Sequence, residues 1–258
     1  MMMRSYTALE LMACAASRVL KDNKSVLVGT GLPMIATSLA QRTHAPGLLI
    51  VFEAGSIGPV IPTLPISVAD SRTTYRAIMT ASMDYVMSAA QQGMIDYAFL
   101  GAAQIDTYGN INTTVIGDHD SPTVRLPGSG GGNDAGSLCW QSIILMRQDR
   151  RRFVRDVDFV TTPGYLSSIG RREESGLPQG TGPYMVITQL GIMGFDELTH
   201  RMGVLALHPG ATLNDARDNT SFDLPALVEP IPTTEPPTLE ELRILREEID
   251  PAHIVIGG

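Results

Sequence analysis

The chain has 258 residues, of which 43% are hydrophobic and 18% are charged, and this balance is ordinary for a globular protein with its own core. Its 19 basic and 27 acidic residues give a formal net charge of -8, which argues against a nucleic-acid-binding protein, because such proteins carry a basic face. Only two cysteines, Cys14 and Cys139, are present, so we expect no disulfide framework and a reducing, cytoplasmic compartment. No apolar run reaches the roughly 18 residues that a membrane span requires, and we expect no membrane association.

The first half of the chain alternates helical and extended patterns. Apolar residues at helical spacing predict core-facing helices, and short, nearly continuous apolar runs predict buried strands between them. The expected elements are helices at residues 7–22, 32–42 and 79–92, and strands at residues 25–29, 48–53 and 97–101. This strand–helix–strand repetition predicts the α/β class, with a mainly parallel sheet flanked by helices.

The second half predicts more antiparallel structure. Strands are expected at residues 142–146 and 157–161, and residues 184–207 have the pattern of a β-meander, with Gly191, Gly194 and Gly203 at its turns. Four prolines make residues 230–237 an extended connector, and a helix is expected at 239–249. No repeat or linker divides the chain. We therefore predict one α/β domain over residues 1–258, with an antiparallel β-meander elaboration.

Glu53 is the first candidate for chemistry, because it ends an apolar strand and is followed by the small residues Ala54, Gly55 and Ser56. Ligands bind at the carboxyl ends of parallel strands, where small residues let a substrate approach the backbone. The carboxylate could be a nucleophile, a general base or a helix cap. Position alone favours the structural interpretation, because most acidic residues have no chemical role.

The glycine-rich run Gly128-Ser129-Gly130-Gly131-Gly132-Asn133-Asp134 is the second candidate. Glycines can present several backbone N–H groups to one oxyanion or phosphate. The run matches neither the Walker motif nor the dinucleotide-binding fingerprint. A flexible loop before the next strand is an equal alternative on composition alone.

Other polar clusters give weaker signals. Gln104, Asp106, Asn110 and Asn112 follow a predicted strand, where a pocket would form, although residues 107–110 also have the composition of a turn. The arginines between residues 147 and 155 could bind phosphates, but a solvated hairpin or a subunit contact is the favoured interpretation. The five histidines show no paired spacing, so we expect no metal site. Ser56 and Ser129 lack the motif of a serine hydrolase.

The chain resembles the class I CoA-transferases, and within them the β-type subunits of glutaconate CoA-transferases. The matching segments occur in order along nearly the whole chain, and their order and spacing make a chance similarity hard to sustain. They are Val28-Gly29-Thr30-Gly31-Leu32-Pro33, Glu53-Ala54-Gly55, residues 101–112, Gly128-Ser129-Gly130-Gly131, Thr162-Pro163-Gly164, His208-Pro209-Gly210 and residues 245–251.

The resemblance implies a role for each part of the site. Glu53 would be the nucleophile that attacks an acyl-CoA thioester and then carries CoA as a glutamyl-CoA thioester. Backbone amides of Ser129, Gly130 and Gly131 would bind CoA and the oxyanion. Gln104, Asn112, Ala54 and Gly55 would line the substrate pocket. Coenzyme A would be a co-substrate, and no permanently bound cofactor is implied.

The resemblance covers only one of the two halves of a transferase. An α-type subunit should complete the active site, so a heteromer of α2β2 or larger is implied and the isolated chain should be inactive. The family often has Ser or Asn where this chain has Ala54, a small change that leaves the carboxylate in place. We hypothesise that the acid partner of acyl-CoA is a small dicarboxylic acid.

Three alternatives stay open. Some relatives on this fold are CoA-ester decarboxylases or carbon–carbon hydrolases, but those have lost the glutamate. A non-catalytic CoA-ester-binding subunit is a second alternative, and a sugar-phosphate-binding protein is a third. The presence of both Glu53 and the glycine run favours CoA transfer over all three, although fold alone does not fix function.

Overall fold

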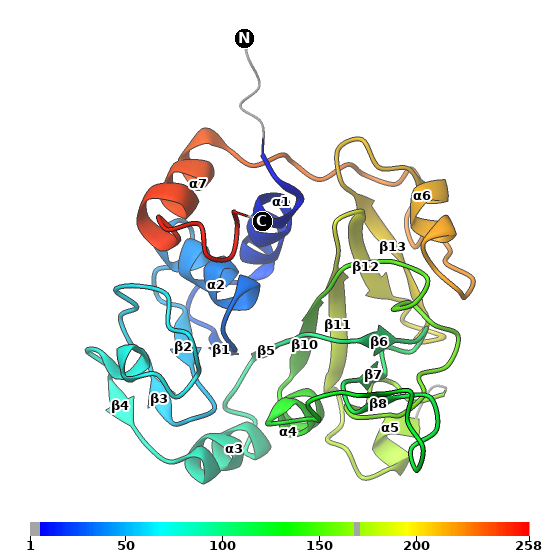
Figure 1. Ribbon diagram of the computed structural model, residues 1–258, viewed down its shortest axis with the longest axis horizontal. Helices are drawn as coiled ribbons and strands as arrows, with labels where there is room; N and C mark the ends of the chain where they lie inside the picture. The colour runs from blue at the N-terminus through cyan, green and yellow to red at the C-terminus, as the bar shows by residue number, and fades with distance from the viewer. Residues whose placement is uncertain (1–5, 168–170, 258) are drawn as a thin grey trace. The chain divides into compact units, whose positions relative to one another are not determined.

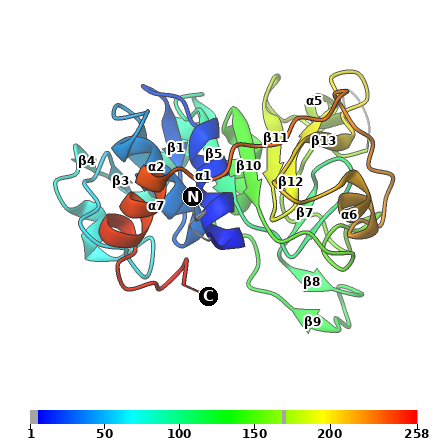
Figure 2. The ribbon, with the colours of Figure 1, turned by 90° about the horizontal axis from the view of Figure 1, so that it is seen from above.

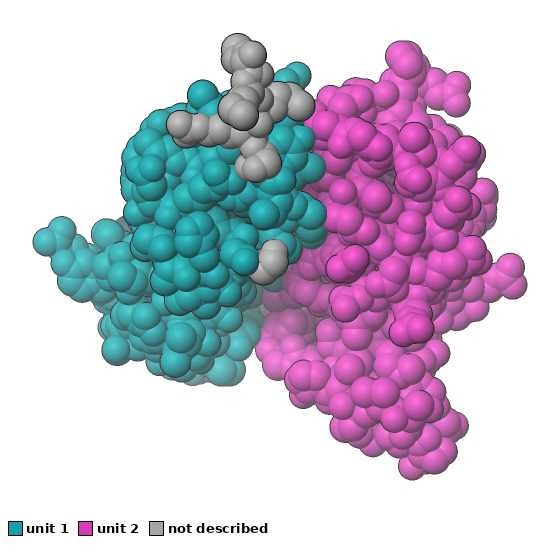
Figure 3. All heavy atoms as spheres, turned by 45° about the horizontal axis from the view of Figure 1, so that its top comes forward, with its two compact units in different colours: residues 1–99, 235–258 teal, residues 100–234 magenta. Residues whose placement is uncertain are grey.

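A computed structural model describes residues 6–167 and 171–257. The chain forms two compact units, which Figure 3 shows in different colours. Unit 1 consists of residues 1–99 and 235–258, and unit 2 of residues 100–234. The segment after residue 234 therefore belongs to the same unit as the first 99 residues. The single domain expected from the sequence stays a prediction.

The sheet of unit 1 has the strand order β5-β1-β2-β3-β4. Strand β1 pairs in parallel with β2 and β5, while β3 and β4 extend the sheet as antiparallel strands. The parallel strands are almost entirely buried, as their apolar runs predict. The strands of this sheet are β1 (Ser25–Leu27), β2 (Leu49–Val51), β3 (Ser56–Ile57), β4 (Met79–Thr80) and β5 (Tyr97–Leu100).

Helices of unit 1 begin where the sequence supplies helix-start signals. Thr7 and Glu10 form a capping box at the first helix, and Pro33 lies in the first turn of the second, after Gly31 with a φ of 79°. Figure 1 shows α1, α2 and α7 grouped together. The helices are α1 (Ala8–Val19), α2 (Leu32–Arg42), the 3-10 helix η1 (Ser71–Thr74), α3 (Met83–Gln91), α7 (Leu239–Arg243) and the π-helix η2 (Ile244–Ile249).

The C-terminal segment is part of the core of unit 1. Ile244, Leu245 and Ile249 pack with Cys14 of α1 and Ile35 of α2 in one buried cluster. The predicted helix at 239–249 is confirmed as α7 followed directly by η2.

An ion pair joins this segment to α1. The Glu10 carboxylate is 2% exposed and accepts hydrogen bonds from Arg246 at 2.5 and 2.9 Å. Burial alone would raise the pKa of Glu10, but the hydrogen bonds from Arg246 and Thr7 outweigh it and hold that pKa below its usual value. The run at residues 245–251 therefore contributes a structural contact within this chain.

In unit 2, four strands are hydrogen-bonded neighbours in the order β13-β12-β11-β10. Strands β10 and β11 are parallel, and β11–β13 form the antiparallel meander predicted from the sequence. Figure 2 shows these strands from above, with the small β8–β9 ladder apart from them. The strands are β6 (Gln104–Ile105), β7 (Ile111–Asn112), β8 (Val115–Ile116), β9 (Val124–Arg125), β10 (Gln141–Leu145), β11 (Gly182–Ile187), β12 (Gly191–Phe195) and β13 (Met202–Leu207), and the helices are α4 (Gly132–Leu138), α5 (Arg171–Glu174) and α6 (Leu213–Asp218). The predicted α/β class is confirmed.

Several local predictions are wrong. Gly194 and Gly203 face each other within β12 and β13 rather than marking turns. Their missing side chains make room for leucines, because an ideal Cβ on Gly194 would lie 2.4 Å from the Leu205 side chain. Gly191 begins β12, so the turns of the meander lie between the strands and not at these glycines.

Two predicted elements also differ from the structure. Residues 157–161 form no strand, and Phe159 and Val160 are exposed there rather than buried. The predicted helix at 79–92 is shorter, because Met79 pairs with Ile57 in the sheet and α3 begins only at Met83. The arginines of residues 147–155 are exposed, as the solvated-hairpin interpretation predicts. Within residues 6–167 and 171–257, no helix is long and apolar enough to cross a membrane.

The two cysteines provide a simple test of the packing. Cys14 and Cys139 are free and fully buried, and burial raises the pKa of each thiol to about 12. We expect neither thiol to react with a thiolate-directed reagent at pH 8 in the native chain, because the thiolate is the reactive form. Titration with Ellman's reagent should find both thiols only after addition of denaturant. Rapid labelling of either cysteine without denaturant would contradict the structure of its unit.

Candidate active site

Glu53 lies at the tip of the tight hairpin that joins β2 to β3. The Phe52 N–H donates to the carbonyl of Ser56 at 2.8 Å, and the Gly55 N–H donates back to the carbonyl of Phe52 at 3.0 Å. Glu53 and Ala54 are therefore the central residues of the turn, which places the carboxylate beyond the end of a buried strand. The side chain is partly exposed.

Gly55 fixes this hairpin by a close backbone approach. Its φ is 115°, and an ideal Cβ would lie 1.9 Å from the carbonyl oxygen of Ala81. The Ala81 N–H also donates to the carbonyl of Gly55 at 2.8 Å, and the hydroxyl of the neighbouring Ser56 donates to the carbonyl of Thr73. Only glycine fits at this position, so the hairpin is held at its base by the residues that lead into α3.

Among the described residues, 6–167 and 171–257, the Glu53 carboxylate has no hydrogen-bond or salt-bridge partner. An acidic side chain on a rigid turn without a compensating cation is free to react with a ligand, whereas a structural helix cap would be bonded to backbone N–H groups. The helix-cap alternative for Glu53 therefore does not fit the geometry.

The first four residues of the glycine-rich run, residues 128–131 of unit 2, form the loop before α4, a helix that the sequence did not predict. Gly128 and Gly130 have φ values of 93° and 49°, and nothing lies within 4 Å of their ideal Cβ positions. The N–H groups of Ser129, Gly130 and Gly131 donate to no acceptor in the part of the chain that the structure describes. Three unsatisfied amides on one exposed loop can bind an anion or an oxyanion.

Gln104 and Asn112 are brought together in the β6–β7 ladder of the same unit. The Asn112 side chain is 0% exposed and donates to the Gln104 side-chain oxygen at 2.7 Å and to the carbonyl of Val115 at 2.6 Å. Gln104 in turn donates to Asp158 at 3.1 Å, and Asp158 accepts the N–H of Gly117 at 2.9 Å. Both amide side chains are thus engaged with protein groups, and Asp158 is a member of the network that the sequence did not reveal.

A second buried network holds the adjoining turn at residues 106–110. The Asp106 carboxylate accepts the N–H groups of Tyr108 and Asn110 at 2.9 and 3.0 Å and the Asn110 side chain at 2.7 Å. The Asn110 side-chain oxygen accepts the N–H of Gly164 at 2.9 Å. The turn predicted from the sequence is confirmed, and it fastens the segment around Thr162-Pro163-Gly164.

The predicted residues thus form three local groups. Glu53, Ala54 and Gly55 share one hairpin of unit 1, Ser129, Gly130 and Gly131 share one loop of unit 2, and Gln104 pairs with Asn112 in unit 2. Among the described residues, no cluster of three or more His, Cys, Asp or Glu side chains could hold a metal ion.

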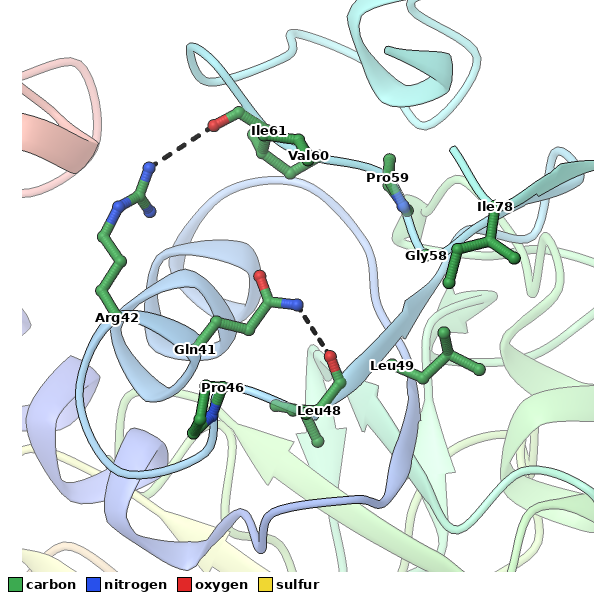
Figure 4. A pocket seen from close by; sticks show the side chains of 11 residues that line it. Gln41, Arg42, Pro46, Leu48, Leu49, Gly58, Pro59, Val60, Ile61 and Ile78 are labelled. Carbon is green, nitrogen blue, oxygen red and sulfur yellow. Dashed lines mark hydrogen bonds between the residues drawn. The ribbon is translucent and has the colours of Figure 1, made fainter. Parts of the chain in front are cut away.

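A separate pocket of about 440 Å³ lies in unit 1 (Figure 4). Its lining is mostly apolar and includes Val60, Ile61 and Ile78, while Gln41 and Arg42 are turned to the carbonyls of Leu48 and Ile61. Glu53 is not among the lining residues. The pocket is therefore distinct from the candidate nucleophile.

The close approach at Gly55 can be tested by adding a single methyl group. We expect Gly55→Ala to lower the free energy of unfolding by about 2–4 kcal/mol, because the Cβ must displace a backbone carbonyl at a left-handed φ. Gly29→Ala is the matched control, since nothing lies within 4 Å of its ideal Cβ and its cost should stay below about 1 kcal/mol. Denaturant unfolding measures both, and equal stability of the two variants would contradict the hairpin geometry.

The Asp106 network predicts a pH dependence. Burial raises the pKa of Asp106 to about 6, although the hydrogen bonds from Asn110 and Tyr108 oppose the shift. The folded-state pKa lies above the unfolded value of about 4. Protonated Asp106 therefore stabilises the folded chain below pH 4, and this stabilisation is lost as the pH rises through about 6.

Comparing the native chain with Asp106→Asn isolates this contribution from other titrating groups. Between pH 4 and pH 6 the native chain should lose on the order of 2–3 kcal/mol of unfolding free energy relative to the variant. A stability difference that stays constant or changes in the opposite direction would contradict a raised pKa at this residue.

Comparisons with known proteins agree with the predicted family. The model of the coenzyme A transferase family matches residues 9–219. The glutaconate CoA-transferase B subunit of Acidaminococcus fermentans is 38% identical over 261 residues, which cover 98% of this chain and 96% of that protein. The 3-oxoadipate CoA-transferase B subunit of Pseudomonas knackmussii is 38% identical over 260 residues, with 99% of each chain covered.

The solved structures support the same conclusion. The crystal structure of glutaconate coenzyme A-transferase from Acidaminococcus fermentans superposes with a TM-score of 0.93 at 37% identity and covers 98% of each chain. The decarboxylase AibA/AibB is more distant, with a TM-score of 0.83 and 26% identity over 98% of this chain and 100% of that one. The fold class, the family and the assignment to the CoA-transferase enzymes that the sequence predicted are confirmed. The chain belongs to the coenzyme A transferase family.

Proposed function

We propose that this chain is the β-type subunit of a heteromeric CoA-transferase in which Glu53 carries CoA between two acids. The observation that carries the proposal is the unpartnered Glu53 carboxylate on a hairpin fixed by Gly55, in a chain of the coenzyme A transferase family. Its relatives at 38% identity are the B subunits of two CoA-transferases.

The proposed reaction proceeds in two exchanges at Glu53. A carboxylate oxygen attacks the thioester carbonyl of acyl-CoA and the C–S bond breaks. CoA departs as its thiolate, and a mixed acyl-glutamyl anhydride remains. The thiolate then attacks the Glu53 carbonyl carbon, which releases the first acid as its carboxylate and leaves a glutamyl-CoA thioester. An acceptor carboxylate runs both steps in reverse and departs as the new acyl-CoA. One thioester replaces another, so the overall free-energy change is small.

A carboxylate is a weak nucleophile, so the rate must come from placement and from stabilisation of the oxyanion. The rigid hairpin supports the first requirement. We assign the second to the N–H groups of Gly130 and Gly131, with Ser129 beside them, because these amides have no acceptor in the described part of the chain. The same amides would bind CoA.

The four residues predicted to line the substrate pocket differ in their contacts. Ala54 is a small residue beside the nucleophile and would leave space for the acyl group, whereas the space beside Gly55 is filled by the Ala81 carbonyl. Gln104 and Asn112 are buried and bonded to protein groups, so we propose that they shape the pocket by positioning residues 112–117. Coenzyme A would bind as a co-substrate in each cycle, without a permanently bound cofactor.

We further propose an α-type partner subunit, in an α2β2 or larger assembly, with residues 1–258 acting as one functional domain in a cytoplasmic enzyme. Unit 1 exposes several large apolar side chains that a partner subunit would cover. Those between residues 60 and 85 are Val60, Ile66, Tyr75, Ile78, Met83 and Tyr85. Val60 and Ile78 also line the pocket of Figure 4. The acid substrate would be a small dicarboxylic acid.

A second candidate is decarboxylation of a CoA ester, since the decarboxylase AibA/AibB shares the fold at 26% identity. The two functions differ in their use of Glu53, because only transfer requires a covalent glutamyl-CoA. A non-catalytic CoA-ester-binding subunit would require no reaction at Glu53 at all.

Replacing Glu53 by Gln tests the proposal in the complex with the α-type partner. The variant keeps the shape of the side chain but lacks the nucleophilic oxygen, so the kcat for exchange of CoA between an acyl-CoA and a free acid should fall by about 10⁴-fold or more. Transfer is measured by the appearance of the new acyl-CoA, with the loss of the donor recorded in parallel.

Glu197→Gln is the matched control, because Glu197 is an exposed glutamate in unit 2 and its replacement should leave the rate unchanged. Donor loss with release of carbon dioxide and no new acyl-CoA would favour the decarboxylase. Retention of full transfer in Glu53→Gln would exclude Glu53 as the nucleophile. Tight CoA-ester binding without turnover in the native complex would favour the non-catalytic alternative.

A further inference from the structure

Arg172 in α5 is a buried cation without a carboxylate partner. Its side chain is 1% exposed, and no salt bridge joins it to any residue of the described ranges 6–167 and 171–257. Burying a guanidinium costs several kcal/mol unless its N–H groups are satisfied. Here all of its nitrogens donate to neutral oxygens, so the position of each acceptor matters for the stability of the unit.

The guanidinium binds the C-terminal end of α4. One terminal nitrogen, Nη2, donates to the carbonyls of Gly136 and Ser137 at 2.7 and 3.0 Å. Carbonyls in the last turn of a helix accept no hydrogen bond from within the helix. They form the negative end of the helix dipole, where a cation is favourable. Arg172 therefore completes the hydrogen bonding of this short helix.

The same guanidinium holds α4 to a neighbouring segment. Its other terminal nitrogen, Nη1, donates to the carbonyls of Pro163 and Gly164 at 2.8 and 3.0 Å, and Nε donates to the Thr181 hydroxyl at 3.2 Å. The contact between α4 and this segment is close, because an ideal Cβ on Gly136 would lie 2.2 Å from the Thr162 side chain.

The glycine-rich loop is attached to the same segment at both ends. On the α4 side, the Asn133 side chain donates to the carbonyl of Thr161 at 2.7 Å. On the other side, Gly128 exchanges hydrogen bonds with Thr113 at 2.8 and 2.9 Å, and the Thr113 N–H donates to the Thr161 hydroxyl at 2.9 Å. Between these attachments, the N–H groups of residues 129–131 have no acceptor in the described part of the chain, while the Ser129 and Gly131 carbonyls accept from the N–H groups of Gly132 and Ala135 at 2.8 and 2.9 Å. Their placement thus depends on how α4 is held against residues 161–164.

We propose that Arg172 is a positioning residue that sets the placement of the Ser129, Gly130 and Gly131 amides through α4. Helix α4 begins at Gly132 and ends at Leu138, so a shift at its C-terminal end is transmitted to the loop over about 10 Å. Lysine cannot replace the arginine, because one ammonium group cannot reach two pairs of carbonyls and a hydroxyl as the planar guanidinium does. The catalytic consequence rests on the proposed function, whereas the placement of the loop does not.

Arg172→Lys in the full chain with its α-type partner tests the proposal with two measurements. Hydrogen exchange followed by mass spectrometry should show exchange of peptides that span 128–138 accelerated by ten-fold or more. The kcat/KM for acyl-CoA should fall by ten-fold or more, while the KM for the acceptor acid stays within two-fold, because only the amide contacts are displaced.

Two controls separate positioning from general destabilisation. Arg171→Lys changes the neighbouring arginine, which is exposed and pairs with Glu174 at 3.5 Å, and it should alter neither measurement. Met193→Ala removes a buried side chain from β12, whereas α4 contacts β10 and β11. It should lower stability without accelerating exchange at 128–138.

If Arg172→Lys fails to fold, Thr181→Val removes the hydroxyl that orients the guanidinium and should give the same two effects at smaller size. Unchanged exchange at 128–138 in the folded variants would overturn the proposal. So would equal acceleration in Met193→Ala. Accelerated exchange in a complex that shows no CoA transfer would uphold the positioning role and count against the proposed function instead.

Discussion

The backbone of Gly55 passes so close to the carbonyl of Ala81 that no side chain fits between them, since an ideal Cβ would lie 1.9 Å from that oxygen. This contact fixes the turn that carries Glu53 to the residues at the start of α3. A carboxylate gains little reactivity from its own pKa, so its usefulness as a nucleophile depends on being held in place before the substrate arrives. The glycine at position 55 is therefore a condition for the chemistry proposed at Glu53, two residues earlier.

Several buried polar groups of unit 2 are paired with uncharged partners. Asn112 and Gln104 bond to each other, Asn110 fastens the segment at 164–166, and Arg172 binds four carbonyls and a hydroxyl. Satisfied networks of this kind are rigid, because each group would lose several hydrogen bonds by moving. Fixed N–H groups stabilise a developing oxyanion without having to reorganise during the reaction.

Helix α1 could be predicted from apolar periodicity alone, and α2, β2 and β5 from apolar patterns that Gly or Pro residues border. The two-residue strands could not be predicted, since two residues show no hydrophobic periodicity. Phe159 and Val160 are residue types that favour strands, but they are exposed and form no strand. Gly194 and Gly203 leave room for leucine side chains and do not mark turns. Of the candidate site, Glu53 and the glycine loop were predicted from residue type and from the resemblance. Arg172 was missed, because it stands in a charged run whose burial only the fold determines.

The most direct test of the central claim is peptide mass spectrometry of the chain, in complex with its α-type partner, after incubation with a saturating acyl-CoA. The account predicts a mass increase that corresponds to CoA in thioester linkage on the peptide that contains Glu53, and loss of that increase when acceptor acid is added. Consumption of the acyl-CoA without any adduct on this peptide would contradict it.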